Sequence, residues 1–153
     1  MIYNVDTSAL VKIYHQETGS DRARALYNSS EDQIVISNLA IPETFSTFHR
    51  KRREGLISKK DALAVLKKFF SDITARFTVT PLEQQHILLS LELIDRRNLR
   101  TLDALHLASA LQLRPLKITF VCADHQLLDA ASREGLAGIN PEQPSLKKQS
   151  HEH

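Results

Sequence analysis

The sequence predicts a three-layer α/β domain, in which helices cover both faces of a central, mainly parallel sheet of about five strands. Short runs rich in β-branched and aromatic residues alternate along the chain with longer segments of helical periodicity. This alternation is typical of strand–helix–strand units, which build parallel sheets with both faces covered. The 153 residues suffice for one domain with its own hydrophobic core.

Local signals place the elements along the chain. Strands are expected at 2–5, 34–37, 77–80 and 118–121, with a last edge strand at 136–139. Helices are expected at 9–14, 20–27, 39–53, 59–70, 82–97, 102–113 and 125–134. The predicted helix caps and helix stops are Asn38, Ser58, Thr101, Gly55 and Gly135. The polar segment that begins at Asn140-Pro141 is expected to be loose.

Composition and cysteine usage narrow the class of protein. Cys122 is the only cysteine, so neither an intrachain disulfide nor a thiolate zinc site is expected, and a cytoplasmic location is the default. The N-terminus lacks the layout of a signal peptide, and no apolar run approaches the ~20 residues of a membrane span. The net charge of +2 is by itself weak evidence for a nucleic-acid partner.

Four acids occupy comparable places in this arrangement. Asp6 and Asp124 each follow a predicted strand, whereas Glu43 and Asp103 each fall early in a predicted helix. Strand ends and helix starts share one edge of a parallel sheet, so these side chains are expected to meet there. Each acid also has an ordinary alternative role, as a helix cap, as a partner of the helix dipole or on a solvated helix face.

A shared pocket for the four acids implies a cation. Carboxylates in one pocket repel one another unless a positive charge joins them, and no lysine or arginine is adjacent to these acids in the sequence. Mg²⁺ prefers oxygen ligands, typically one or two carboxylates with waters and phosphate oxygens. Such an ion lowers the pKa of a bound water and stabilises the transition state of phosphodiester hydrolysis. The acids are therefore candidates for a metal-dependent hydrolytic site.

Ordered sequence blocks carry a family resemblance. They are Asp6-Thr7-Ser8-Ala9-Leu10-Val11, Glu43 with Ser46, Leu102-Asp103-Ala104-Leu105-His106-Leu107-Ala108, Ala123-Asp124-His125-Gln126-Leu127-Leu128, and the ending Gly135-Leu136 with Asn140-Pro141. Together they resemble the successive motifs of a PIN domain, and the ending resembles the VapC-type toxins of toxin–antitoxin pairs. The resemblance implies a PIN-like nuclease domain at 1–141, followed by a polar C-terminal tail at 142–153.

The resemblance also implies an activity. PIN domains of this type are endoribonucleases that hydrolyse RNA with a water activated by Mg²⁺ or Mn²⁺. By motif position, the catalytic and metal-binding acids would be Asp6, Glu43, Asp103 and Asp124. The implied partners are the RNA substrate, a cognate antitoxin protein and a second copy of the chain, with no membrane. Cys122 departs from the pattern, because similar proteins often have Thr or Ser there, and this puts a supporting hydroxyl contact in question.

Positive charge concentrates in one run, whose residues are Arg50, Lys51, Arg52 and Arg53. A charge run on a helix is usually a solvated face, and the alternative here is contact with RNA phosphates. Both interpretations remain open. His106 lies three residues after Asp103 in a helix rich in leucine and alanine, where a packed, hydrogen-bonded histidine is expected rather than a metal ligand.

Other classes of function remain as alternatives to the ribonuclease. A phospho-accepting receiver domain has a similar architecture, but it needs an acceptor aspartate after the third strand, where Thr80-Pro81 stands. An aspartyl-phosphate phosphohydrolase needs a second acid two residues after Asp6, where Ser8 stands. A non-catalytic PIN-like binding module has no need of four intact acids. We therefore predict a ribonuclease, with the binding module and the receiver as alternatives.

Overall fold

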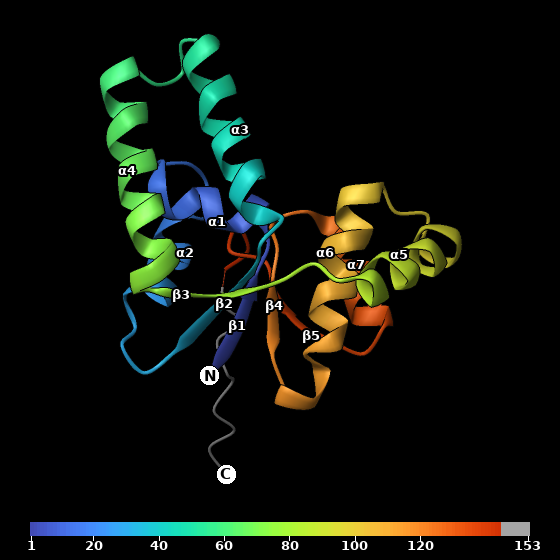
Figure 1. Cartoon of the computed structure of the whole chain (residues 1–153). Coiled ribbons are helices and arrows are strands. Elements are labelled where there is room, and N and C mark those ends of the chain that lie inside the picture. Colours follow the sequence, from blue (N-terminus) through green and yellow to red (C-terminus); the bar gives the residue numbers. More distant parts are fainter. Residues whose placement is uncertain (145–153) are drawn as a thin grey trace.

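The computed structural model describes residues 1–144 and contains one five-stranded, fully parallel sheet (Figure 1). Its strands are β1 (Ile2–Val5), β2 (Gln33–Ser37), β3 (Phe77–Thr80), β4 (Thr119–Val121) and β5 (Ala137–Ile139). They lie in the order β3-β2-β1-β4-β5, so the chain moves outward from β1 on one side and then outward from β4 on the other. The predicted α/β class and the five-stranded sheet are confirmed.

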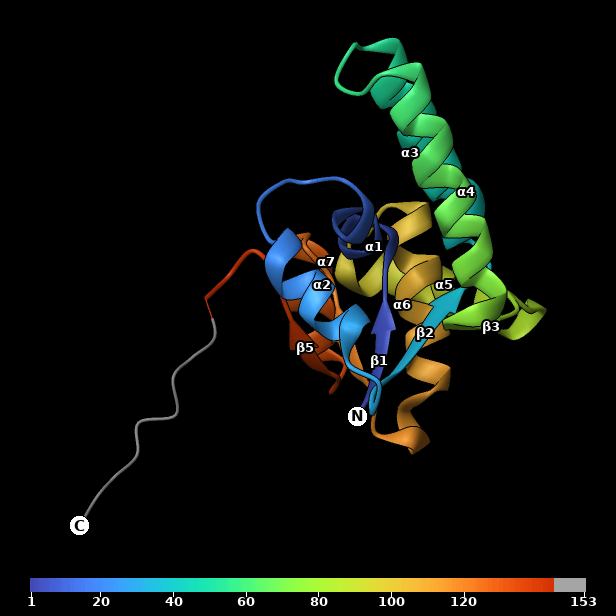
Figure 2. The ribbon, with the colours of Figure 1, turned by 90° about the vertical axis from the view of Figure 1, so that its left-hand side faces the viewer.

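Helices cover both faces of the sheet (Figures 1 and 2). On one face pack α1 (Thr7–Tyr14), α2 (Ser20–Asn28), α3 (Ala40–Arg53) and α4 (Lys59–Ala75), around a core that includes Tyr3, Ile34 and Phe69. On the other pack α5 (Gln84–Arg97), α6 (Thr101–Gln112) and α7 (His125–Arg133), around Leu107, Phe120 and Leu127. A short 3₁₀ turn, η1 (Arg114–Leu116), joins α6 to β4. None of the helices described in residues 1–144 is long and apolar enough to cross a membrane.

Helices α3 and α4 form a hairpin that projects well beyond the sheet (Figures 1 and 2). Helix α4 runs to Ala75, five residues beyond the predicted end at Phe70. The extension has a tertiary cause, because the last turns of α4 bury Phe69 and Asp72 against helices α1 and α2. Ser58 caps α4 as predicted, with its hydroxyl accepting a hydrogen bond from the Asp61 N–H at 3.0 Å.

Two predicted caps are wrong. The Asn38 side chain does not cap α3; its Oδ1 accepts a hydrogen bond from the Leu82 N–H at 3.1 Å, and its own N–H donates to the Thr80 carbonyl at 2.9 Å. Asn38 therefore ties the end of β2 to the end of β3. Thr101 is the first residue of α6 rather than its cap, and Arg100 takes the capping position without a side-chain hydrogen bond.

The segment after β5 is docked rather than loose as far as the structure describes it. The Arg22 guanidinium donates to the carbonyls of Asn140 at 3.2 Å and Gln143 at 2.7 Å. The backbone of Pro141 and Glu142 lies so close to Gly19 that an added Cβ would stand 3.0 Å from it, and Gly19 has a φ of +89°. The expectation of a loose chain is therefore wrong as far as Gln143, and residues 145–153 of the predicted tail lie outside the described residues.

A buried carboxylate joins the α3–α4 hairpin to the body of the domain. Asp72 is 2% exposed. It accepts hydrogen bonds from the hydroxyls of Tyr14 at 2.6 Å and Tyr27 at 2.9 Å, and from the Lys68 ammonium at 3.0 Å. A buried charge is costly unless hydrogen bonds satisfy it, and these three donors come from three helices. Asp72 therefore holds α1, α2 and α4 in one arrangement.

Asp72→Ala is expected to destabilise the protein by about 3 kcal/mol, because it leaves the two partly buried tyrosine hydroxyls and the Lys68 ammonium without their acceptor. Urea unfolding followed by circular dichroism measures the loss. Asp129→Ala is the control, since Asp129 forms an exposed pair with Arg133 at 2.9 Å and should cost less than about 1 kcal/mol. Equal losses in the two variants would contradict the assignment of Asp72 as a buried anchor.

Candidate functional site

Asp6 lies at the carboxyl end of the central strand, where β1 passes into α1. Its side chain is buried, at 4% exposure, and accepts hydrogen bonds from the Ser8 hydroxyl at 2.7 Å and the Ala9 N–H at 3.1 Å. Asp6 thus caps the N-terminus of α1, which is the helix-capping role expected as its alternative. Burial raises the pKa of Asp6 above its usual range, against the opposing effect of His106 and of these hydrogen bonds. The folded protein therefore disfavours the charged form of this capping carboxylate.

Glu43, early in α3, lies beside the start of α1. Its Oε1 accepts a hydrogen bond from the Thr7 hydroxyl at 2.8 Å and contacts Nε2 of His106. The same Nε2 is 3.3 Å from the Thr7 hydroxyl. Burial alone would raise the pKa of Glu43, but the hydrogen bond and positive charge of His106 hold it below its usual range. Three elements, α1, α3 and α6, meet at this contact.

His106 is the residue that the sequence analysis undervalued. It is buried and hydrogen-bonded, as expected, but its partner is one of the four predicted site acids. Burial alone would lower the pKa of His106, yet the Glu43 hydrogen bond and the charges of Asp6, Glu43 and Asp103 raise it. The imidazolium thus supplies positive charge among the acids. Its spacing of three residues from Asp103, one helical turn, was the signal available in the sequence.

Asp103 and Asp124 complete the set of acids. Asp103 lies in the first turn of α6, and Asp124 caps α7 by accepting a hydrogen bond from the Leu127 N–H at 2.8 Å. The pKa of Asp103 is raised, first by burial and then by the negative charges of Asp124, Asp6 and Glu43, with His106 opposing. The negative charges of all three other acids therefore act on Asp103, and the four acids lie at one edge of the sheet.

The acids differ in how free they are to hold a cation. Across residues 1–144, no three side chains of His, Cys, Asp or Glu gather closely enough to hold a metal ion. The reason lies in their other contacts, since Glu43 turns to His106 while Asp6 and Asp124 accept backbone N–H groups. The donors are nevertheless the carboxylate oxygens that Mg²⁺ prefers, and burial together with the neighbouring acids raises the pKa of Asp103.

Cys122, the departure from the family pattern, lies behind this edge. The Ser8 hydroxyl contacts its Sγ at 3.9 Å, donates to Asp6, and accepts from the Ala123 N–H at 3.0 Å. Burial raises the pKa of the Cys122 thiol, which keeps it protonated. A hydroxyl therefore does support Asp6, and it comes from Ser8 rather than from position 122.

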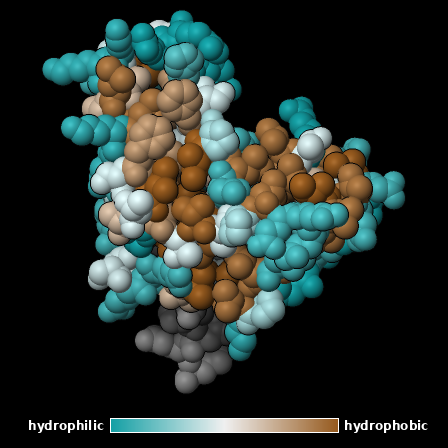
Figure 3. Space-filling view, in the orientation of Figure 1, coloured by the Kyte–Doolittle hydropathy of each residue, from teal (hydrophilic) through white to brown (hydrophobic). Residues whose placement is uncertain are grey.

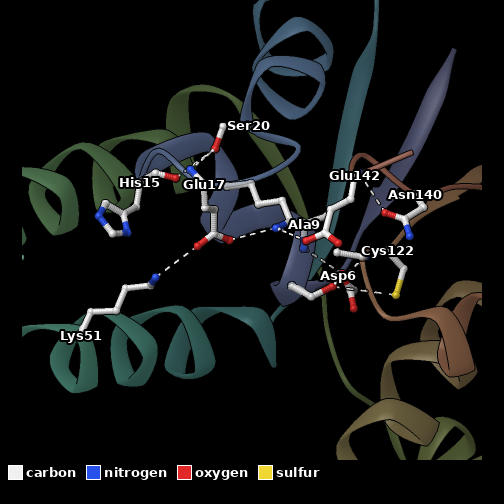
Figure 4. Close-up of polar contacts among 12 residues, drawn as sticks. Asp6, Ala9, His15, Glu17, Ser20, Lys51, Cys122, Asn140 and Glu142 are labelled. Carbon is white, nitrogen blue, oxygen red and sulfur yellow. Dashed lines mark hydrogen bonds and ion pairs between the residues drawn. The ribbon is translucent and has the colours of Figure 1, made fainter. Parts of the chain in front are cut away.

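The predicted basic run occupies the last turn of α3. Arg50 and Arg53 are exposed and Arg52 is partly exposed. Lys51 differs, because it is 13% exposed and its ammonium pairs with the Glu17 carboxylate at 3.2 Å (Figure 4). The run thus divides into three accessible arginines and one lysine engaged inside the protein.

The fold defines a class of protein, the parallel α/β domains with helices on both faces of the sheet. The acids lie at the carboxyl ends of β1 and β4, where the strand order changes direction and such domains have their sites. The model of the PIN domain family matches residues 3–131, and the chain belongs to this family. The resemblance predicted from the sequence blocks is confirmed.

Individual relatives agree with this assignment. Ribonuclease VapC47 of Mycobacterium tuberculosis (strain CDC 1551 / Oshkosh) is 29% identical over 144 residues, which span 92% of this chain and 97% of the relative. The crystal structure of VapC20 from Mycobacterium tuberculosis, described as a sarcin–ricin loop cleaving toxin, has a TM-score of 0.64 at 19% identity, covering 92% of this chain and 100% of that one. A toxin–antitoxin complex from Klebsiella pneumoniae has a TM-score of 0.61 at 13% identity, covering 93% and 99%.

Asp103→Asn is expected to leave the metal-free protein at least as stable as the wild type near neutral pH. The pKa of Asp103 is raised from 3.8, so the folded state binds this proton more tightly than the unfolded state does. The wild type therefore loses stability as the pH rises from below that value through the raised pKa, and the amide variant does not.

Urea midpoints in EDTA near neutral pH and near about pH 4 measure this difference, which should shrink at the lower pH. Asp129→Asn, on the exposed surface of α7, is the control and should not show the same pattern. Marked destabilisation of Asp103→Asn at neutral pH would mean that Asp103 is a structural acid.

Proposed function

We propose that this protein is a metal-dependent endoribonuclease that hydrolyses RNA phosphodiesters, and that it acts as the toxin of a toxin–antitoxin pair. Membership of the PIN domain family and the similarity to Ribonuclease VapC47 support the reaction class. The single observation that carries the proposal is the position of Asp103 at one sheet edge with three other acids, where burial first and then their negative charges raise its pKa. The negative charge at this edge favours the binding of a cation, and a cation there could also bind the oxygens of a phosphodiester.

In this proposal Asp6, Glu43 and Asp103 hold Mg²⁺ or Mn²⁺, and Asp124 completes the pocket. A bound ion of this type lowers the pKa of water and offsets negative charge on the phosphate, so no protein nucleophile is needed. The chain itself contributes rigidity, because Ser8 and the Ala9 N–H hold the Asp6 carboxylate in one orientation. Thr7 and His106 hold Glu43 in a different arrangement, from which its carboxylate would turn to reach the cation.

RNA reaches this edge past the basic run. We propose that Arg50, Arg52 and Arg53 contact backbone phosphates, since the end of α3 projects into solvent on the hairpin (Figure 2). Lys51 is left out of this role, because its ammonium already pairs with Glu17.

The partners of this protein follow from the same similarity. We propose that a cognate antitoxin binds the chain, in line with the Klebsiella pneumoniae neighbour, which is a toxin–antitoxin complex. We also propose a homodimer, because large apolar side chains remain exposed on the hairpin and on α5 and α6 (Figure 3). Those side chains are Phe45, Leu63, Phe70, Ile87, Leu88, Leu91 and Leu102.

Asp103→Asn is expected to lower Mg²⁺-dependent cleavage of RNA by about 100-fold or more, because the cation would lose a ligand. Cleavage of a panel of structured RNAs, with Mg²⁺ and with EDTA, measures the effect. Mg²⁺ should also raise the melting temperature of the wild type more than that of the variant.

Asp129→Asn makes the same change of charge on an exposed helix and should cleave like the wild type. Near-normal cleavage by Asp103→Asn would remove Asp103 from the site. A wild type that binds RNA without cleaving it in Mg²⁺ or Mn²⁺ would instead favour the non-catalytic binding module.

Replacing Arg50, Arg52 and Arg53 together by glutamine is expected to weaken RNA binding and to reduce the slope of log Kd against log salt by up to about 2, at ~0.7 for each phosphate contact on a single strand. Fluorescence anisotropy with a labelled RNA oligonucleotide in EDTA measures both quantities. The control removes the same number of cations away from the acid edge, at Lys67, Lys117 and Arg133. An unchanged slope in the test variant would assign the run to a solvated helix face.

A further inference from the structure

A groove of about 420 Å³ connects the acid edge with a separate cluster of charges. Ser8 and Asp124 line it from the acid edge, and Lys12, Lys51 and Glu142 line it from the cluster. Figure 4 shows Glu17, Lys51 and Glu142 of this cluster beside α1. A ligand that occupied the whole groove would touch both regions at once.

Lys12 is the centre of the cluster. Its side chain is 5% exposed, and its ammonium pairs with Glu17 at 3.0 Å and with Glu142 at 2.7 Å. A buried ammonium is costly without an anion, so Lys12 must keep at least one partner. Glu17 has a second cation, because its other oxygen pairs with Lys51 at 3.2 Å. Within residues 1–144, the only cation paired with Glu142 is Lys12.

The Glu142 carboxylate is the exchangeable member of this cluster. Its side chain is 35% exposed, whereas the backbone around it is held by contacts that do not involve the carboxylate. The Glu142 N–H donates to Asn140 Oδ1 at 2.9 Å, and Arg22 holds the carbonyls of Asn140 and Gln143. The carboxylate can therefore leave Lys12 while the C-terminal segment stays docked.

We propose that Lys12 forms an anion subsite for a backbone phosphate of the RNA strand, and that the Glu142 carboxylate fills this subsite until RNA displaces it. This inference rests on the proposed function, since the strand must also reach the acids. A phosphodiester carries one negative charge, as Glu142 does, so the exchange keeps the buried ammonium paired. Arg50 lines the same groove, is exposed, and adds a second cation on the path of the strand.

The subsite also suits the charge at the acid edge. A phosphate approaching four carboxylates is repelled until a cation is present, and Lys12 and Arg50 attract the same strand from the neighbouring part of the groove. Glu142 opposes this attraction as long as it remains on Lys12. The residue thus acts as an internal competitor that weakens RNA binding by the free protein.

Glu142→Gln in the full chain is the test. A labelled single-stranded RNA oligonucleotide in EDTA is the probe, and anisotropy is measured over a range of salt concentrations. At low salt the variant should bind roughly twofold to fivefold more tightly, as expected when a partly exposed ion pair no longer competes. Glu31→Gln, an exposed acid at the opposite edge of the sheet, is the control for the change in net charge and should give a smaller gain.

Lys12→Met provides the second arm, with melting curves to establish that it folds. It should bind RNA more weakly than the wild type, with a salt slope lower by about 0.7, the value for one phosphate on a single strand. Combined with Glu142→Gln, it should abolish the gain of that variant, because the subsite is gone.

Several results would overturn the inference. They are wild-type affinity of Glu142→Gln, an equal gain from Glu31→Gln, or a gain that persists in the double variant. If the wild type cleaves RNA in Mg²⁺ while one of these results is found, the subsite fails and the proposed function stands. If the wild type neither binds nor cleaves RNA, both fail.

Discussion

The parallel pairing of β1 with β2 on one side and β4 on the other is the constraint on which the candidate site depends. The hydrogen bonding of this ladder continues past the strand, since the Asp6 N–H donates to the Val121 carbonyl at 3.1 Å. Asp6 is therefore placed by the sheet itself, next to the segment that carries Asp124. The chain builds β2 and β3 on one side of β1, and later β4 and β5 on the other side. The helices of the two layers therefore diverge at the carboxyl ends of β1 and β4.

Electrostatics at this edge is divided among unequal acids. Glu43 has a proton affinity below the usual range because His106 contacts it, whereas Asp6 and Asp103 have raised pKa values. The raised pKa of His106 favours its protonated form, which compensates part of the negative charge of the acids. Within residues 1–144 no three of these side chains gather closely enough to hold a cation, so Glu43 would have to turn from His106 to help bind one.

Helix α1 links the acid edge with the charge cluster. Its first residues support Asp6 and Glu43, and Lys12 in the same helix pairs with Glu17 and Glu142. Through Glu17 the cluster also reaches Lys51 on the projecting hairpin. Contacts of the domain thus extend at least to Gln143, beyond the boundary we expect at 141. Glu142 in the C-terminal segment therefore lines the same groove as Ser8 and Asp124.

The sequence by itself determined the order of strands and helices, the parallel sheet and the positions of Asp6, Glu43, Asp103 and Asp124 at strand ends and helix starts. Each of these follows from local periodicity, capping chemistry and the geometry of βα units. Tertiary structure decided the pairing of His106 with Glu43, the diversion of Lys51 to Glu17 and the docking of Glu142 on Lys12. It also decided the length of α4, through Asp72 and the two tyrosines. Most of these contacts join residues far apart in the chain, where patterns of neighbouring residues carry no information about which charges will meet.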